Sequence, residues 1–254
     1  MFHRVKKYIF IICLCTFQVS ISSFAPGVPV KNNHAAKEGF ALVELFTSEG
    51  CSSCPPADEA IGRLKGSKYN VYVLSFHVDY WNYLGWKDAF SNAEYSIRQQ
   101  EYGALFHLNS IYTPQIIVNG KTQFVGSDET RLRQSIESSL KEAPAAEIYL
   151  KIQSSNISEV NVSWNTPPTA GLTMHIALVQ KFTKDFIQRG ENKGQTLNHY
   201  FTVRDFQSVG ALAGSGISRL SIPTGLQNSD CLIVAFLQDP KTGYITGATS
   251  SVIP

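Results

Sequence analysis

The sequence predicts an α/β protein in two parts: an α/β domain with a helical insertion over residues 39–143, and a smaller, β-rich, sandwich-like domain over residues 144–254. In the first part, apolar runs of strand length alternate with helical patterns. In the second part, apolar and polar residues alternate with a period of two, as they do in half-buried strands. Turn-rich segments separate these strands, as in all-β sandwiches.

Length and composition exclude several classes of protein. The chain has 254 residues, 43% of them hydrophobic and 17% charged. This is a globular composition with room for one or two domains, and a chain of this length needs no metal or disulfide simply to fold. The formal net charge of +2 comes without a basic cluster, so we expect no nucleic-acid binding.

The first 25 residues have the pattern of a secretory signal peptide. A basic start, MFHRVKK, is followed by about 15 apolar residues and a small-x-small sequence at 23–25. The apolar run is shorter than the roughly 20 residues that span a membrane, and no later stretch is long enough. We therefore expect export to the periplasm or the medium, with no membrane-spanning segment after the signal is removed.

Removal of residues 1–25 takes away three basic residues and leaves 19 basic against 20 acidic ones, a net charge of −1. Three cysteines remain: Cys51, Cys54 and Cys231. Residues 26–38 are polar and contain proline and glycine, which is typical of a short leader. So few cysteines exclude a disulfide-stapled scaffold.

The first part is expected to contain four strands and three helices. The strands are 40–46, 70–77, 115–118 and 121–125, and the helices are 55–64, 91–105 and 128–141. Pro55 and Pro56 fit the first turn of a helix, where amide hydrogens have no partner inside the helix. Asn119-Gly120 predicts a tight hairpin turn because both residues tolerate a positive φ.

The second part is expected to be built from strands. The clearest are 147–153, 159–164, 172–179 and 231–237, and the turn-rich segments are 165–171, 189–194 and 210–216. Cys231 begins an apolar strand and is expected to be a buried, inert thiol.

Cys51 and Cys54 form a Cys-x-x-Cys motif at a predicted strand-to-helix junction. The positive end of the helix stabilises a thiolate on Cys51, which makes Cys51 the attacking group. Cys54 can then attack the mixed disulfide that forms between Cys51 and a substrate. Glu49 opposes this stabilisation through its negative charge. The motif is also compatible with half of a zinc site or with an inert disulfide, although no second cysteine pair is present.

The order of strand, Cys-x-x-Cys, helix, strand, insertion, Thr-Pro and hairpin resembles the thioredoxin superfamily over residues 39–142. The resemblance implies that Glu44 is a buried carboxylate that shuttles a proton for the resolving cysteine. It also implies that Thr113-Pro114 contains a cis-proline, which packs against the disulfide and binds an extended peptide.

Several longer motifs are similar to one bacterial family of exported proteins, known as domain of unknown function 1223. These motifs lie at residues 44–58, 77–88, 112–115 and 189–204, so the resemblance extends from about residue 40 to the end of the chain. Membership implies a fold and an exported location but no substrate.

His77 ends the second predicted strand and Trp81 follows it, at a strand end where functional residues often lie. We assign both to substrate binding. A hydrogen-bonded structural histidine and an aromatic plug that anchors the insertion are the alternatives.

The sequence thus predicts an exported thiol–disulfide oxidoreductase that acts on protein thiols through Cys51 and Cys54. Glu44 would move a proton, and Thr113, Pro114, His77 and Trp81 would bind substrate. No cofactor or metal is expected, because the electrons reside in the two sulfurs. Two alternatives stay open: a binder of Cu(I) or another soft metal through the two cysteines, with or without His77, and a non-catalytic envelope protein with a structural disulfide.

Overall fold

The computed structural model describes residue 1 and residues 38–66, 70–167, 169–211 and 213–254. The predicted signal peptide and leader lie outside the described residues, apart from Met1 and Glu38. The chain divides into the units Met1–Ala35 and Ala36–Pro254, and every element below belongs to the second unit. Among the described helices, none has the length and apolar character that crossing a membrane requires.

The predicted elements of the first part are confirmed in type and order. They are β1 (Ala41–Thr47), α1 (Pro55–Gly62), β2 (Val71–His77), α2 (Ala93–Leu105), β3 (Gln115–Val118), β4 (Thr122–Val125) and α3 (Glu129–Ser139). The second part folds as β5 (Tyr149–Ser155), β6 (Glu159–Asn165), β7 (Thr173–Phe186), β8 (Thr196–Gly210), β9 (Ser215–Ser221), β10 (Cys231–Gln238) and β11 (Ile245–Val252). The sequence pattern missed β8, β9 and β11.

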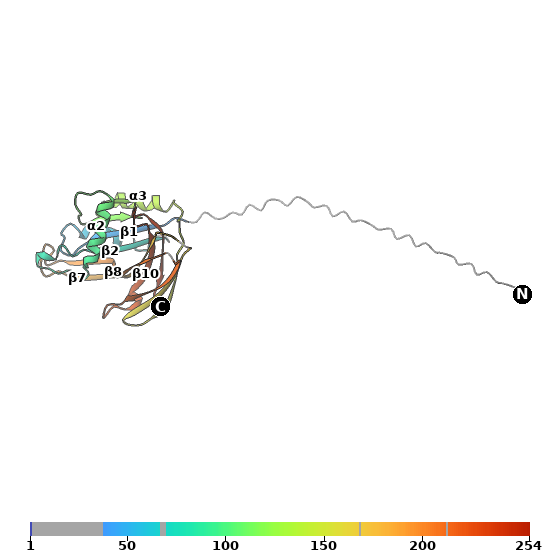
Figure 1. Cartoon of the computed structure of the whole chain (residues 1–254). Helices are drawn as coiled ribbons and strands as arrows, with labels where there is room; N and C mark the ends of the chain where they lie inside the picture. Colours follow the sequence, from blue (N-terminus) through green and yellow to red (C-terminus); the bar gives the residue numbers. More distant parts are fainter. Residues whose placement is uncertain (2–37, 67–69, 168, 212) are drawn as a thin grey trace. The chain divides into compact units, whose positions relative to one another are not determined.

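Most strands belong to one mixed sheet of eight strands. Its order is β11-β10-β7-β8-β2-β1-β3-β4, and a second sheet has the order β5-β6-β9. Figure 1 labels five strands of the large sheet: β1, β2, β7, β8 and β10. Strand β1 is parallel to β2 and antiparallel to β3. Strand β8 is parallel to β2, with Thr202 beside Ser75. The large sheet therefore continues from the first part of the chain into the second.

The predicted fold class is wrong in its architecture. The chain does not form a thioredoxin-like domain with a helical insertion followed by a separate sandwich-like domain. The described residues are mostly β, with a mixed eight-stranded sheet, a three-stranded sheet and three short α-helices. The physical reason is the pairing of β8 with β2, which covers a sheet edge that would otherwise be exposed. Sequence periodicity identifies strands but not their neighbours.

Alternate residues of β1 face opposite sides of the large sheet, as expected for a strand. Val43 and Leu45 pack against α1 and α3 in one hydrophobic core. Leu42 and Phe46 pack against α2 in another core on the other face. A third core lies between the three-stranded sheet and strands β7 and β10. A polar side chain of β1 therefore lies near α1 and α3 or near α2, according to the face of the sheet to which it points.

Candidate functional site

The predicted cysteine pair forms a disulfide at the junction between β1 and α1. Cys54 is the N-cap residue of α1, and the two prolines predicted for the first turn occupy it. The Cα atoms of Cys51 and Cys54 lie 5.4 Å apart. The Cys54 amide donates a hydrogen bond to the Cys51 carbonyl over 3.2 Å. The two sulfurs are thus held at the start of the helix, as the sequence predicted.

Both cysteines are buried. Cys51 is 0% exposed and Cys54 is 1% exposed, whereas Ser52 and Ser53 between them are exposed. The hydroxyl of Ser53 lies 3.4 Å from Sγ of Cys51. The two cysteines are therefore closed to solvent, although the two serines between them are open to it.

A loop from the second part of the chain is bonded to the cysteine segment. We call residues 187–195, between β7 and β8, the cover loop. Asn192 of this loop donates hydrogen bonds to the carbonyls of Glu49 and Cys51, over 2.8 and 3.0 Å. Glu191 accepts a hydrogen bond from the Ser52 amide over 3.0 Å. Hydrogen bonding from the Ser52 side chain, followed by that from its amide, lowers the pKa of Glu191. The cover loop thus fixes the backbone on both sides of Cys51.

Trp81 lies between the cysteine segment and the predicted Thr-Pro pair. Its indole N–H donates to the Thr113 hydroxyl over 2.8 Å. A Cβ atom built on Gly50 would come within 2.8 Å of the Trp81 Cβ, so the two residues are in close contact. The Thr113–Pro114 peptide bond is cis. The structure therefore brings Trp81 and Thr113 to the segment that carries the disulfide.

Pro114 lies near the start of α1. Gly126 fits between the two, because a Cβ at this position would be 2.9 Å from the Ala57 Cβ and 3.0 Å from the Pro114 Cβ. Gly126 also donates its amide hydrogen to the Pro114 carbonyl over 2.9 Å.

Glu44 is not brought to the cysteines. Its buried carboxylate faces α2, on the side of β1 opposite to α1. It accepts hydrogen bonds from Nε of Arg98 over 2.6 Å and from the Tyr102 hydroxyl over 2.5 Å. Burial lowers the pKa of Arg98, but the Glu44 carboxylate outweighs this and raises it above its ordinary value. Glu44 is therefore one half of a buried ion pair.

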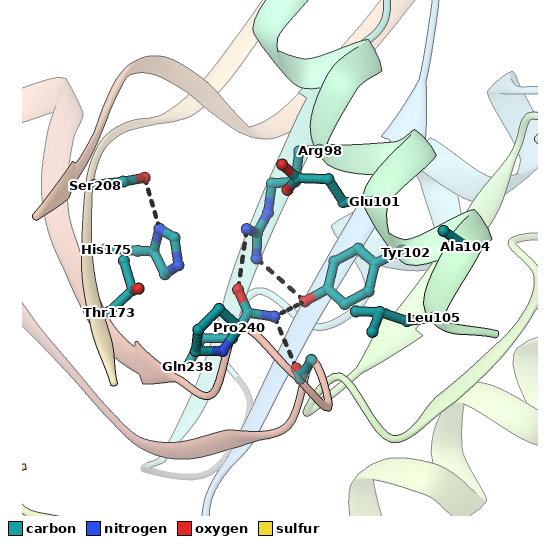
Figure 2. Close-up of a pocket in the computed structure, with 11 residues that line it drawn as sticks. Arg98, Glu101, Tyr102, Ala104, Leu105, Thr173, His175, Ser208, Gln238 and Pro240 are labelled. Carbon is teal, nitrogen blue, oxygen red and sulfur yellow. Dashed lines mark hydrogen bonds between the residues drawn. The ribbon is translucent and has the colours of Figure 1, made fainter. Parts of the chain in front are cut away.

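Arg98 of this ion pair lines a cavity of about 490 Å³ (Figure 2). Arg98 donates to Gln238 and Tyr102, each over 3.1 Å. His175 lines the same cavity and bonds to Ser208 over 2.8 Å. Burial, followed by the charge of Arg98, holds the pKa of His175 well below its usual range. Arg98, Tyr102 and Gln238 are thus bonded to one another in the cavity wall, and neither cysteine lines the cavity.

His77 is buried at the end of β2. Its Nδ1 lies 2.7 Å from a carboxylate oxygen of Asp88. Burial raises the pKa of Asp88, but His77 and backbone hydrogen bonds from Glu49 and Phe90 outweigh burial and lower it overall. The His77 ring stands edge-on to the His199 ring, with centroids 4.9 Å apart. The structure thus places His77 in a buried polar cluster and not on a surface open to substrate.

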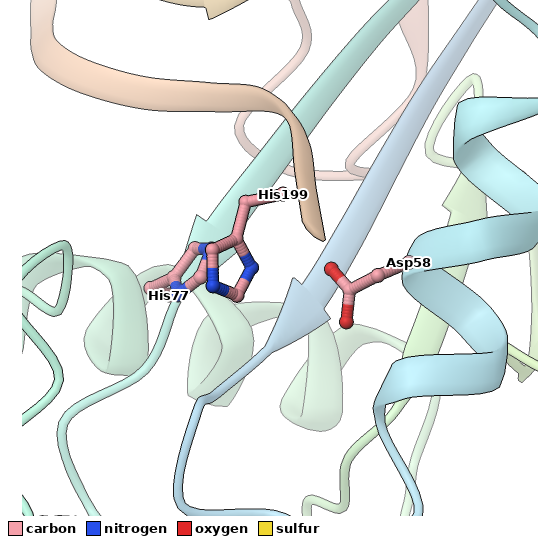
Figure 3. A group of neighbouring side chains, drawn as sticks. All are labelled: Asp58, His77 and His199. Carbon is pink, nitrogen blue, oxygen red and sulfur yellow. The ribbon is translucent and has the colours of Figure 1, made fainter. Parts of the chain in front are cut away.

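Asp58 belongs to the same cluster and lies on α1, one turn after Cys54 (Figure 3). Its Oδ2 accepts a hydrogen bond from the Thr47 hydroxyl over 3.0 Å. Burial raises the pKa of Asp58 from 3.8 to about 7, and His199 partly offsets this rise.

The sequence interpretation missed Asp58, His199, Glu191 and Asn192. The last three lie in the motif at 189–204, which indicated a family but no role. Asp58 ends the motif at 44–58, which likewise indicated a family but no role. The prediction for Cys231 is confirmed, since this thiol is free and buried, and burial raises its pKa to about 11.

The fold and site define a mostly β protein with one mixed eight-stranded sheet and a buried Cys-Ser-Ser-Cys disulfide at the start of a helix. The chain belongs to the family described as "Protein of unknown function (DUF1223)", whose model matches residues 42–238. The resemblance to this family is therefore confirmed.

The chain is also similar to solved structures. The crystal structure of protein AGR_C_4864 from Agrobacterium tumefaciens matches with 28% identity and a TM-score of 0.65, over 86% of this chain and 97% of that one. A domain of the outer membrane lipoprotein Omp28 from Porphyromonas gingivalis matches with 12% identity and a TM-score of 0.27, over 43% of this chain and 88% of that one. No curated protein matches the chain.

Proposed function

We propose that this chain is an exported thiol–disulfide oxidoreductase that acts on protein thiols through Cys51 and Cys54. The observation that carries the proposal is the disulfide between these residues at the N-terminal end of α1. A helix N-terminus stabilises negative charge and so lowers the pKa of a cysteine thiol there. The local order of β1, cysteine pair, α1 and Thr113–Pro114 resembles the active-site region of the thioredoxin superfamily. We use that resemblance only for the chemistry of the site and not for the fold.

The exchange balances without a cofactor. A thiolate of a partner dithiol attacks Sγ of Cys51, the bond to Cys54 breaks, and Cys54 leaves as a thiolate. The partner's second thiolate then attacks the partner sulfur of the mixed disulfide and releases the Cys51 thiolate. The partner has lost two electrons and the cysteine pair has gained them. The reverse sequence reduces a partner disulfide.

Access to Cys51 requires movement of the cover loop, because both sulfurs are buried. Asn192 and Glu191 hold this loop on the cysteine segment through three hydrogen bonds. When it moves, the Trp81–Thr113 contact and Pro114 supply the wall nearest to the cysteine segment. An extended peptide that carries the partner cysteine fits such a wall. Glu44 has no role in this proposal because its carboxylate is paired with Arg98.

The burial of both cysteines favours a second candidate, a structural disulfide in a non-catalytic protein. The two candidates differ in reduction potential. Exchange proteins have potentials of roughly −120 to −270 mV, whereas structural disulfides lie below about −300 mV.

The experiment is to equilibrate the purified mature chain, without residues 1–25 and their two cysteines, across glutathione buffers and to count its free thiols with an alkylating mass tag. The Cys231→Ser variant removes the background thiol and serves as the reference protein. The Cys54→Ser variant in this background is then incubated with a disulfide-bonded protein such as insulin.

A potential in the exchange range, together with a mixed disulfide on Cys51, is the expected result. A potential below about −300 mV with no mixed disulfide would overturn the proposal in favour of the structural disulfide.

A further inference from the structure

Three buried side chains from three separate elements converge on one point. Asp58 comes from α1, His77 from the end of β2 and His199 from β8 (Figure 3). One oxygen or nitrogen atom of each lies within 4.8 Å of the other two. The side chains are nearly inaccessible to solvent, with exposures of 5%, 1% and 1%.

Each of these three side chains has one buried polar atom without a hydrogen-bond partner. Oδ1 of Asp58, Nε2 of His77 and Nδ1 of His199 are buried, and among the residues that the structure describes none of them has a partner. Buried polar atoms are nearly always hydrogen-bonded in proteins, because an unpaired one costs about 1–3 kcal/mol. Three such atoms at one point therefore indicate a missing partner shared by all three.

The outer atoms of the two imidazoles fix their tautomers. Nδ1 of His77 lies 2.7 Å from Asp88, and Nε2 of His199 lies 3.2 Å from Glu49. A carboxylate accepts hydrogen bonds, so these two nitrogens carry the hydrogens. In its neutral form, each ring then presents a bare lone pair from its other nitrogen. Two nitrogen lone pairs and a carboxylate oxygen of Asp58 then lie close together with no donor between them.

We propose that Asp58, His77 and His199 bind one divalent transition-metal ion of the Zn²⁺ type. Zinc–nitrogen bonds are about 2.0–2.1 Å and zinc–oxygen bonds about 2.0–2.2 Å, so two ligands of one tetrahedral ion are roughly 3.3–3.5 Å apart. The cluster therefore closes on such an ion with an inward movement of its side chains.

The residues that bond to the three proposed ligands are arranged as they are around a metal site. Metal-binding histidines commonly donate their other N–H to a carboxylate, which orients the ring and increases its basicity. Asp88 and Glu49 provide this contact to His77 and His199, respectively. Glu49 is itself held by the Trp86 indole N–H over 2.7 Å. All three ligands are thus oriented, since Thr47 holds the outer oxygen of Asp58.

The donor set selects the class of ion. Two imidazole nitrogens and one carboxylate oxygen suit Zn²⁺ and similar divalent ions, whereas Cu(I) favours sulfur ligands. Three protein ligands leave one coordination position open for water or another small ligand, as in catalytic zinc sites. This inference is independent of the proposed exchange chemistry, because the disulfide stays closed throughout.

The test is a calorimetric titration of the full chain with Zn²⁺, after EDTA treatment and with the disulfide intact. We expect one ion per chain and a higher melting temperature with Zn²⁺ present. The variants Asp58→Asn and His199→Gln should lose the binding. Glu49→Gln, which removes only the carboxylate behind His199, should weaken it about 10–100-fold. His175→Gln changes a buried histidine outside the cluster and should bind as the wild type does.

Binding that persists in Asp58→Asn and His199→Gln, or no binding by the wild type, would overturn the proposal. X-ray absorption at the zinc edge of the loaded wild type keeps the test decisive if a variant fails to fold. We expect nitrogen and oxygen neighbours that include two imidazoles. A sulfur neighbour would assign the ion to the cysteines and refute this site. The outcome is separable from that of the exchange experiment, which measures thiols.

Discussion

Two buried polar clusters lie on opposite faces of the large sheet, and they differ in how completely they are bonded. On the α2 face, Glu44, Arg98, Tyr102 and Gln238 bond to one another, and the guanidinium also lies over four aromatic rings. On the α1 face, each of Asp58, His77 and His199 has one bonded atom and one atom without a partner. The first cluster is complete in itself, whereas the second is complete only with something added.

The difference separates a structural role from a functional one. A buried charge whose partners are all present stabilises one arrangement of the chain, and removal of one partner leaves a costly lone charge. Buried atoms without partners are kept at a cost to stability, which is typical of functional sites. From the sequence, Glu44 was the favoured acid. In the structure, Asp58 is the acid that has a carboxylate oxygen without a hydrogen-bond partner.

The largest expected effect comes from breaking the complete cluster. Arg98→Leu leaves the Glu44 carboxylate buried without its charge partner and should lower the free energy of unfolding by about 3–5 kcal/mol. Urea unfolding with the disulfide intact measures this. The double variant Glu44→Leu/Arg98→Leu should lose less, because no lone charge remains. A loss under about 1 kcal/mol in the single variant would remove the distinction between the clusters.

The next effect concerns the cover loop. Asn192→Ala removes two hydrogen bonds to the backbone around Cys51 and should speed reduction of the disulfide by dithiothreitol about tenfold, which corresponds to about 1.4 kcal/mol. Thiol trapping over time measures the rate. Lys193→Ala, an exposed neighbour in the same loop, is the matched control. Equal rates in both variants would mean that the loop does not limit access.

A pH effect of similar size is expected at His175, on the face of the complete cluster. Burial and Arg98 hold its folded-state pKa well below 6.5, so only the unfolded chain takes up a proton as the pH falls below 6.5. The stability that the neutral ring contributes is therefore present above pH 6.5 and lost below it, by about 1.4 kcal/mol at pH 5.5. Urea unfolding at pH 5.5 and 7.5 should show this loss in the wild type and a smaller one in His175→Gln. Equal losses in the wild type and in His175→Gln would contradict this role of His175.

The smallest effect has the opposite sign. Asp58→Asn should raise the free energy of unfolding in EDTA at pH 8 by about 1 kcal/mol. Burial raises the folded-state pKa of Asp58 from 3.8 to about 7, so the stabilisation from its neutral form is lost as the pH rises towards 7. At pH 8 the wild type bears the charged carboxylate. Added Zn²⁺ should stabilise only the wild type. A variant less stable than the wild type in EDTA would indicate that Asp58 is already satisfied.

Local features of the fold could be predicted from the sequence. Pro55 and Pro56 mark the start of α1 because the backbone chemistry of a helix N-terminus is set by neighbouring residues. Asn119 and Gly120 mark the hairpin for the same reason, and both have a positive φ. The cysteine disulfide at the helix start also follows from local order.

Long-range features could not be predicted. No periodicity shows that β8 runs beside β2, and this pairing changes the fold class. Asp58 and His199 meet across 141 positions of sequence because α1 and β8 are neighbours in space. The role of Glu44 depended on a residue of α2, Arg98, whose position opposite β1 is set by packing. A single sequence contains the identity of such residues but not their proximity.

The contact between Asn192 and Cys51 joins positions 141 residues apart and has a consequence for the order of events during biosynthesis. The cysteines leave the ribosome long before the loop that later encloses them. Contacts between segments so distant in the chain form late in folding, because the intervening chain must first be ordered. We therefore expect oxidation of the pair on a partly folded chain, with enclosure as a later step that seals a bond already made.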